Sequence, residues 1–358
     1  MDSQLNEWPE PIVAVQSIAE SGAALIPECY VKAIADRPAA PAGAAGKDLS
    51  IPVIDLGRLG GSAVECRATM RAIADACREW GFFQAVNHGV DADLVDEMVA
   101  VWREFFYLPM EEKKKLANSP QTYEGYGSRL GVEKGATLDW GDYFYLHLLP
   151  NCAKNFDKWP TKPASCRKIT EEYGRQMANL CGTLMKVLSI SLGLDVGFLQ
   201  EKFGGDEIGT CMRINYYPKC PQPELTLGLS PHSDPGGLTV LLADHRVSGL
   251  QVRRGADWVT VNPIPGALIV NVGDQIQVLS NATYKSVDHR VVTNAAAERM
   301  SVAFFFNPKC DLPMEPAREL VTQDRPPMYR PMTFNQYRLF IRKKGPMGKS
   351  HVDSLQAM

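Results

Sequence analysis

The feature that most constrains the fold is a run of short apolar segments between Gly209 and Pro308, separated by turns rich in Gly, Pro, Asn and Asp. Six of these segments have the length and the β-branched or aromatic residues that are typical of strands. They are residues 213–217, 238–242, 249–252, 268–272, 287–292 and 302–306. Many short strands at regular spacing predict a sandwich or barrel, and a jelly roll is the simplest arrangement of them.

Two histidines and one aspartate in this region form the most informative chemical pattern of the chain. His232 and Asp234 are two residues apart, so in a strand their side chains point to the same face. His289 follows 55 residues after Asp234 in another strand-like segment. Two histidines and a carboxylate form the facial triad of non-haem Fe(II) oxygenases, which leaves coordination positions open. Such ligands also hold catalytic zinc, but the sequence lacks the H-E-x-x-H motif that would support a zinc hydrolase.

Arg299 and Ser301 form a second polar pair, which begins ten residues after His289. In a strand they share one face. A guanidinium group can bind a carboxylate through two parallel hydrogen bonds, and a hydroxyl beside it adds a third. Alone, an arginine next to Glu298 is better interpreted as a solvated charge. The spacing from His289 instead favours binding of the distal carboxylate of a keto-diacid whose other end chelates iron.

Arg213, Asn215 and Tyr217 lie at positions i, i+2 and i+4 of one predicted strand, so their side chains should project from one face. A strand face with these three residues either faces solvent or lines a polar cavity. Because His232 follows 15 residues after Tyr217, the sequence favours the cavity.

A terminal helix is predicted over residues 333–344, with Thr333 as its N-cap. Arg338 and Arg342 are four residues apart and therefore lie on one face of this helix. From composition alone, that face is interpreted as basic and solvated.

The part of the chain before residue 205 has a different pattern. Residues 37–50 are rich in Pro, Ala and Gly and predict a loose linker. Short strands are expected at residues 51–56 and 82–86. Apolar residues at helical spacing predict three amphipathic helices, around residues 66–80, 94–105 and 169–187.

Composition excludes several classes of partner and setting. The 358 residues carry a formal net charge of −3, which gives no reason to expect binding to nucleic acid or to an anionic membrane. No stretch of about 18 apolar residues predicts a transmembrane helix, and no signal peptide is expected. The nine cysteines are odd in number and lack C-x-x-C spacing. They indicate a reducing compartment, so a cytoplasmic or nuclear location is expected.

These motifs resemble those of plant 2-oxoglutarate/Fe(II)-dependent dioxygenases. The resemblance lies in RINYYPKCP at 213–221, His232-Ser233-Asp234, His289-Arg290-Val291 and Arg299-x-Ser301, and it covers most of residues 50–342. It implies a double-stranded β-helix core with a helical N-terminal region and a C-terminal helix. It implies Fe(II) as the metal, 2-oxoglutarate as the co-substrate, O₂ as the oxidant and ascorbate as a supporting reductant. The implied ligands are His232, Asp234 and His289 for iron, and Arg299, Ser301, Asn215 and Tyr217 for 2-oxoglutarate.

Within this family the chain is most similar to the jasmonate-induced oxygenases, through EWPEPIV at 7–13 and QYRLFIR at 336–342. Those enzymes hydroxylate jasmonic acid at carbon 12, which lowers active jasmonate signalling and defence responses. The resemblance implies that Arg213, Arg338 and Arg342 bind the jasmonate carboxylate, which replaces the interpretation of a solvated helix face. It makes Phe305 and Tyr145 candidates for the apolar wall, where Tyr145 stands at a position expected to carry Phe.

The resemblance also suggests a division of the chain. The expected parts of the chain are an N-terminal extension and linker (1–50), an N-terminal helical region (51–204), a jelly-roll domain (205–310) and a C-terminal helix and tail (311–358). Two alternative functions stay open. A flavonoid dioxygenase of the anthocyanidin-synthase or flavonol-synthase type would share every iron and 2-oxoglutarate residue. A non-catalytic hormone-binding protein on the same fold is the other alternative, although the complete triad argues against it.

Overall fold

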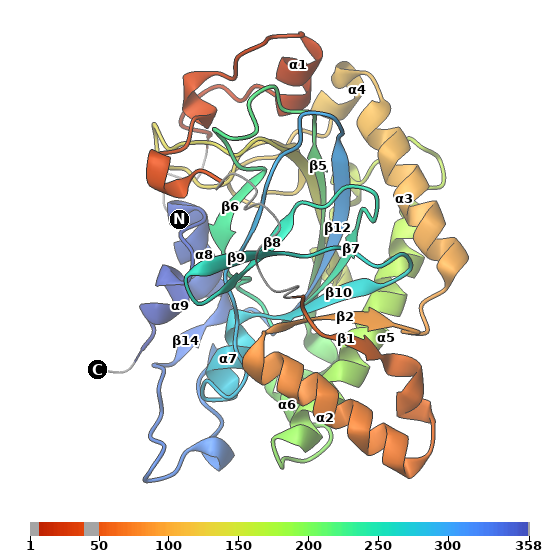
Figure 1. The fold of residues 1–358 in the computed structure, drawn as a ribbon, viewed down its shortest axis with the longest axis vertical. Coiled ribbons are helices and arrows are strands. Elements are labelled where there is room, and N and C mark those ends of the chain that lie inside the picture. The colour runs from red at the N-terminus through yellow and green to blue at the C-terminus, as the bar shows by residue number, and fades with distance from the viewer. Residues whose placement is uncertain (1–6, 39–49, 357–358) are drawn as a thin grey trace.

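Two facing β-sheets form the frame of the molecule (Figure 1). The structure, a computed structural model, describes residues 7–38 and 50–356, so most of the predicted linker lies outside the described residues. The major sheet has eight strands in the order β1-β2-β10-β7-β12-β5-β4-β3, and the minor sheet has four in the order β6-β11-β8-β9. The predicted jelly-roll core, with helices before it and a helix after it, is confirmed.

The strands are short and mostly antiparallel, as the turn-rich sequence predicts. The major sheet comprises β1 (Val53–Asp55), β2 (Phe82–Val86), β3 (Gly125–Gly127), β4 (Asp142–Leu149), β5 (Gly209–Tyr217), β7 (Leu238–Ala243), β10 (Leu268–Val272) and β12 (Arg299–Asn307). The minor sheet comprises β6 (Leu229–His232), β8 (Leu250–Arg254), β9 (Asp257–Thr260) and β11 (His289–Val291), and a separate hairpin pairs β13 (Pro313–Met314) with β14 (Met332–Thr333). All six strands predicted between Gly209 and Pro308 are present; residues 268–272 form a strand with the predicted bounds, and the bounds of the other five differ by a few residues.

Four strands of the major sheet come from the region in which the sequence predicts mainly helices. β4 is the longest of them and pairs with β5 from Asp142 opposite Tyr216 to Leu149 opposite Thr210. One face of β4 is buried, and the other carries the half-buried Tyr145, His147 and Leu149. Because the half-buried face also consists mostly of aromatic and apolar residues, the sequence lacks a clear alternation of apolar and polar residues. This composition explains why no strand is predicted here.

Side-chain caps mark the start of three of the described helices. The described helices are α1 (Val15–Glu20), α2 (Ala63–Glu79), α3 (Ala92–Tyr107), α4 (Met110–Lys114), α5 (Cys166–Ser191), α6 (Phe198–Lys202), α7 (Asp274–Leu279), α8 (Phe334–Lys344) and α9 (Ser350–Asp353). Capping boxes start α2, through Ser62 and Glu65, and α8, through Thr333 and Gln336. The predicted capping by Thr333 is therefore confirmed. No helix within the described ranges is long and apolar enough to cross a membrane.

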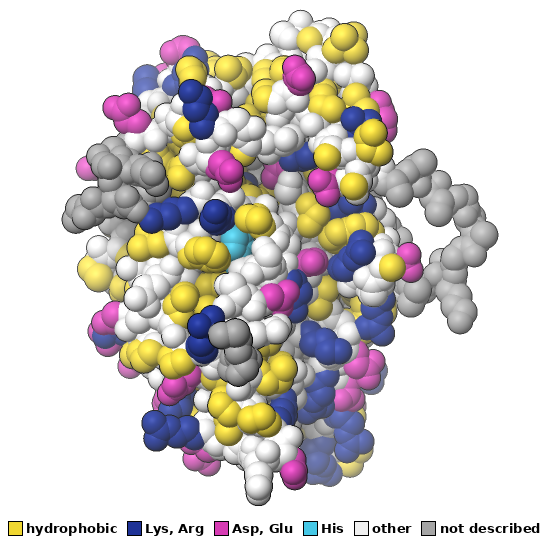
Figure 2. Space-filling view, turned by 90° about the vertical axis from the view of Figure 1, so that its left-hand side faces the viewer, with side chains coloured by type: hydrophobic (Ala, Val, Ile, Leu, Met, Phe, Trp, Pro, Cys, Tyr) yellow, Lys and Arg dark blue, Asp and Glu magenta, His cyan; other side chains and the backbone are white. Residues whose placement is uncertain are grey.

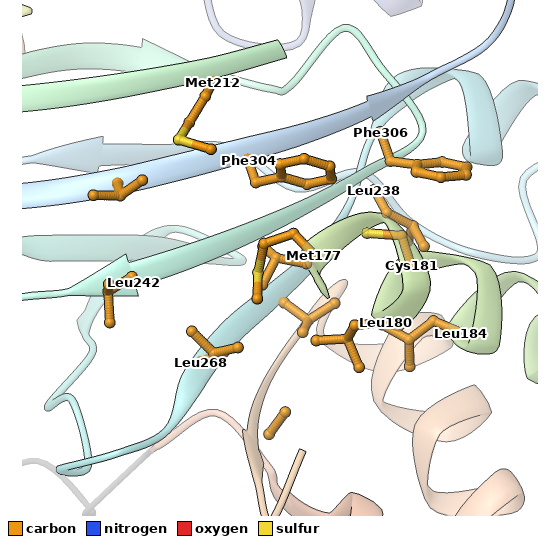
Figure 3. Close-up of a cluster of buried hydrophobic side chains, with 14 of the residues drawn as sticks. Met177, Leu180, Cys181, Leu184, Met212, Leu238, Leu242, Leu268, Phe304 and Phe306 are labelled. Carbon is orange, nitrogen blue, oxygen red and sulfur yellow. The ribbon is translucent and has the colours of Figure 1, made fainter. Parts of the chain in front are cut away.

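The outer face of the major sheet is the main hydrophobic core. Met177, Leu180 and Leu184 of α5 lie against this face, and Phe304 and Phe306 of β12 point toward the helix (Figure 3). In Figure 1, α3 and α5 lie on this side of the sheets, whereas α8 and α9 lie on the opposite side of the molecule. Because the outer face is packed against helices, the inner face between the two sheets is left for polar side chains.

Met177 provides a test of this core. Its side chain is 0% exposed, so Met177→Ala leaves a cavity beneath the sheet and should lower the free energy of unfolding by about 2–5 kcal/mol. Met328→Ala is the control: that methionine is 43% exposed, and its truncation should change the free energy by less than about 0.5 kcal/mol. Urea denaturation of both variants measures the difference. Equal stabilities would contradict the packing described for α5.

Candidate functional site

His232, Asp234 and His289 meet between the two sheets. β6 and β11 are antiparallel, and His232 lies directly opposite His289 in their register. The Oδ1 atom of Asp234 is 3.8 Å from Nε2 of His232 and 3.7 Å from Nε2 of His289. One possible ligand atom from each residue lies within 4.8 Å of the other two. Two imidazoles and one carboxylate at this spacing could hold a single transition-metal ion.

Hydrogen bonds orient each of these three side chains. Nδ1 of His232 is 2.9 Å from the carbonyl oxygen of Ser230, and Nδ1 of His289 is 3.2 Å from that of Val287. A carbonyl partner places the proton on Nδ1 and leaves Nε2 available as a metal ligand.

The carboxylate of Asp234 is fixed from the major sheet. Its Oδ2 accepts hydrogen bonds from Oγ1 of Thr239 at 2.6 Å and from Nδ2 of Asn271 at 2.7 Å. These two bonds hold Oδ2, so that Oδ1 faces the two histidines. Asp234 itself lies in the loop between β6 and β7, so two strands of the major sheet orient a carboxylate that lies outside both sheets.

The electrostatic environment favours the protonation states that bind metal. Burial, followed by repulsion from His289, lowers the pKa of His232 to about 4. Burial alone would raise the pKa of Asp234, but the two histidines and the bonds from Asn271 and Thr239 outweigh it and hold that pKa below its usual value. A neutral imidazole beside an ionised carboxylate is the form that coordinates a cation.

The inner face of the major sheet collects the four residues predicted to bind a keto-diacid. In the register of β5 and β12, Arg299 lies opposite Tyr217 and Ser301 lies opposite Asn215. Directly opposed residues of an antiparallel pair project to the same side of the sheet. The two pairs therefore form one polar patch, as the alternation of the sequence predicts.

Arg299 is the residue of this patch whose burial is energetically most costly, because it carries a charge. It is 3% exposed, and burial lowers the pKa of its guanidinium. Its three side-chain nitrogens make no hydrogen bond of regular geometry to a described residue, and its closest aromatic contact is the ring of Tyr217, 5.5 Å from the guanidinium carbon. Oδ1 of Asn215 is likewise unsatisfied within the described residues. Unsatisfied buried donors are costly, and a carboxylate bound by the guanidinium would satisfy them. These residues fit 2-oxoglutarate.

A cavity of about 190 Å³ reaches His232 and Asp234 from the side of α8. On the face that carries α8 and α9, one histidine is visible among hydrophobic and basic side chains (Figure 2). Within the lining of this cavity, Asp234 is the sole carboxylate. The lining contains all five residues predicted to contact substrate, which are Arg213, Tyr145, Phe305, Arg338 and Arg342.

Two of the three arginines of this cavity contact uncharged groups of the protein. The guanidinium of Arg213 lies 4.2 Å from the ring centre of Tyr143. Arg342 donates to the carbonyl oxygens of Gln121 at 2.8 Å and Thr122 at 3.2 Å. Burial and the nearby Arg338 lower the pKa of Arg342. Three converging cations beside largely apolar walls can bind one end of an anionic, otherwise hydrophobic molecule.

Several lining residues were not predicted from the sequence. They include Tyr123, Leu130, Tyr143, Cys211 and His351. Tyr123 lies in a loop with φ at 62°, where the hydroxyl donates to the carbonyl oxygen of Arg342 at 3.4 Å. Such a loop has no helix or strand periodicity to reveal it. His351 reaches the cavity because Gly348 forms a bridge with His232, a contact that no local pattern indicates.

Comparisons with known proteins agree with this geometry. Residues 208–308 match the 2OG-Fe(II) oxygenase superfamily, and residues 51–162 match the family of the non-haem dioxygenase in morphine synthesis N-terminal region. The chain is 57% identical over 351 residues to Jasmonate-induced oxygenase 2 of Arabidopsis thaliana, which covers 98% of this chain and 94% of the relative.

Two further comparisons are informative. The chain is 44% identical over 291 residues to Flavanone 3-dioxygenase 2 of Oryza sativa subsp. japonica, which covers 81% of this chain and 83% of the relative. A crystal structure of JOX2 in complex with 2OG, Fe and JA matches with a TM-score of 0.92 at 56% identity, and covers 99% of this chain and 100% of that chain.

Thr239 provides a test of how Asp234 is oriented. Thr239→Val keeps the shape of the side chain but removes the donor to Oδ2 of Asp234, so affinity for Fe(II) should fall on the order of 10-fold. The matched control is Thr210→Val, because Thr210 is also buried in the major sheet but its hydroxyl has no hydrogen-bond partner within the described residues. Anaerobic calorimetry measures both affinities. An unchanged affinity in the Thr239 variant would show that this bond does not orient the carboxylate.

Proposed function

Because the chain belongs to the plant 2-oxoglutarate/Fe(II)-dependent dioxygenases, with Fe(II) as its metal and 2-oxoglutarate as its co-substrate, we propose that it hydroxylates jasmonic acid at carbon 12. The overall reaction converts jasmonic acid, 2-oxoglutarate and O₂ into 12-hydroxyjasmonate, succinate and CO₂. Removal of jasmonic acid in this way would lower active jasmonate signalling and defence responses. The observation that carries the proposal is the convergence of Arg213, Arg338 and Arg342 in a cavity that reaches His232 and Asp234.

His232, Asp234 and His289 are the residues assigned to Fe(II). Their three donors lie within 4.8 Å of one another, and the histidines present Nε2 to the shared space. When bound, Fe(II) would supply the oxidative chemistry that couples decarboxylation of 2-oxoglutarate to hydroxylation of a C–H bond. Thr239 and Asn271 fix the carboxylate of Asp234, and the walls of the cavity limit access to the metal site.

Arg299, Ser301, Asn215 and Tyr217 are assigned to 2-oxoglutarate. The guanidinium of Arg299 would bind the distal carboxylate, with the hydroxyls of Ser301 and Tyr217 beside it. Burial of this patch excludes water, so that a charge-assisted hydrogen bond is stronger there than at the surface. The unsatisfied nitrogens of Arg299 support this role.

The jasmonate carboxylate is assigned to Arg213, Arg338 and Arg342. One arginine comes from β5 and two come from α8, so the anion would connect the sheet to the helix. Phe305 and Tyr145 line the same cavity and would contact the apolar part of the substrate. A fatty-acid-derived carboxylate needs this combination of cations at one end and an apolar wall along the rest.

Incubation of the iron-loaded protein with jasmonic acid, 2-oxoglutarate and ascorbate tests the reaction directly, because mass spectrometry detects 12-hydroxyjasmonate. Changing Arg338 and Arg342 together to Ala should raise the KM for jasmonic acid on the order of 100-fold, since two charge-assisted contacts are lost. The KM for 2-oxoglutarate should stay nearly the same. Turnover of 2-oxoglutarate on another substrate, without any hydroxyjasmonate, would contradict the proposal.

Flavonoids are the alternative class of substrate. One relative, at 44% identity, is named Flavanone 3-dioxygenase 2. Flavonoids carry no carboxylate, so turnover of a flavonoid would not depend on Arg338 and Arg342. The double Ala variant therefore separates the two classes. His232→Ala addresses the third possibility, a non-catalytic hormone-binding protein, because a protein that acts by binding alone need not lose its biological effect in this variant, whereas an enzyme would.

Arg299→Gln tests the assignment of the co-substrate. Loss of a charged donor pair to a buried carboxylate should raise the KM for 2-oxoglutarate on the order of 10- to 100-fold. The dissociation constant of jasmonic acid should stay nearly constant, because Arg299 is not part of the cavity lining that contains Arg338. Steady-state kinetics and calorimetry measure the two quantities. If the variant weakened jasmonic acid and left 2-oxoglutarate unaffected, the two assignments would have to be exchanged.

A further inference from the structure

β6, which carries His232, is the edge strand of the minor sheet. It has four residues and pairs with β11 at only two register positions, with an irregularity between them. On its other side the structure records one bridge, between His232 and Gly348. By contrast, His289 lies in β11, which is paired with β6 on one side and β8 on the other. Strand pairing alone therefore holds His232 less firmly than it holds His289.

A largely buried ion pair contacts β6 at a position two residues before His232. Nζ of Lys32 lies 2.8 Å from Oδ1 of Asp139, and the side chains are 6% and 15% exposed. Nζ of Lys32 also donates to Oγ of Ser230 at 3.0 Å. Asp139 accepts from Oγ of Ser230 at 2.6 Å and from the Ser230 backbone N–H at 3.0 Å. Ser230 is thus held by three hydrogen bonds to two charged residues.

Ser230 transmits this restraint to the metal site. Its carbonyl oxygen is the partner of Nδ1 of His232, at 2.9 Å. The orientation of the imidazole therefore depends on the position of the Ser230 peptide. Lys32 reaches it from a segment that precedes the predicted linker, and its own backbone N–H donates to the carbonyl oxygen of Leu225 at 2.9 Å.

We propose that Lys32 is a positioning residue for the metal. Together with Asp139 it fixes Ser230, and through the carbonyl oxygen of Ser230 it keeps Nε2 of His232 directed at the metal. A buried ion pair is seldom retained for its contribution to stability alone, because desolvation offsets most of the attraction between the charges. Substitution of residues that orient a metal-binding histidine typically lowers the affinity for the metal by about 10- to 100-fold. The inference rests on the assignment of His232 to Fe(II) and is independent of the substrate.

Lys32→Met tests the proposal, with Lys113→Met as the matched control. Lys113 is 1% exposed and also belongs to the packing of the N-terminal segment, since its Nζ donates to Gln16 and to the carbonyl oxygen of Phe106. Lys32→Met should weaken Fe(II) binding on the order of 10- to 100-fold in anaerobic calorimetry. It should also lower the visible charge-transfer absorption of the Fe(II)–2-oxoglutarate complex at a fixed concentration of iron. Lys113→Met should bind Fe(II) with an affinity within about twofold of that of the unmodified protein, even if its melting temperature falls as much as that of Lys32→Met.

Two further variants keep the test decisive. Ser230→Ala removes the hydroxyl that joins Lys32 to β6 but retains the backbone bond to Asp139, so it should fold normally and show a smaller loss of Fe(II) affinity. Combining Lys32→Met with Asp139→Asn should weaken Fe(II) binding by less than the product of the two single effects, because both act through Ser230. Fe(II) affinities of Lys32→Met and Ser230→Ala within twofold of the unmodified protein would overturn the proposal, and so would equal losses in Lys32→Met and Lys113→Met. His232→Ala separates this failure from a failure of the metal assignment, because only the latter predicts that the variant still binds Fe(II) normally.

Discussion

The antiparallel register of β12 is the constraint on which the site depends. Its pairing with β5 sets Arg299 opposite Tyr217 and Ser301 opposite Asn215, and its pairing with β7 sets Phe305 opposite Thr239. Thr239 in turn holds Asp234 of the loop between β6 and β7. A shift of β12 by one residue would move its own Arg299, Ser301 and Phe305 to the outer face. The apolar residues between them, which pack on α5, would then face the metal ligands, so the hydrophobic core and the polar site fix the same register together.

Burial of polar side chains on the inner face of the major sheet destabilises the fold, and packing elsewhere in the protein offsets this effect. Arg299 loses most of its hydration in the folded protein, and within the described residues it gains no regular hydrogen bond in return. Such a group destabilises the protein without its ligand and favours binding of an anion that restores the lost interactions. The extensive packing between α5 and the major sheet supplies the stability that permits this arrangement. Preorganisation at the site therefore depends on ordinary apolar contacts on the opposite face.

Part of this arrangement could be predicted from the sequence, because a period of two places Arg299 and Ser301 on one face of β12. Asp234 does lie beside His232, but it follows the end of β6, so strand periodicity is not what brings the two together. What local periodicity could not supply was contact between distant segments. Arg338 and Arg342 look like a solvated helix face until α8 is seen to line the cavity. β4 escaped prediction because its half-buried face also carries aromatic and apolar side chains. Lys32 escaped prediction because its partners Asp139 and Ser230 lie more than a hundred residues away. The resemblance to a family corrected the first of these cases but carried no information on Lys32.

The residues proposed to hold iron and 2-oxoglutarate lie on other elements than two of the arginines proposed to bind the substrate. The proposed metal and 2-oxoglutarate residues lie on strands or directly beside them, where a change of position would disturb two sheets. Arg338 and Arg342 lie on α8, which is outside both sheets and starts from its own capping box. Substitutions on α8 can therefore alter the charge of the cavity while the register of β12 is preserved. This division gives a physical reason why members of one family can retain the same iron chemistry and act on molecules as different as a carboxylic acid and an uncharged flavonoid.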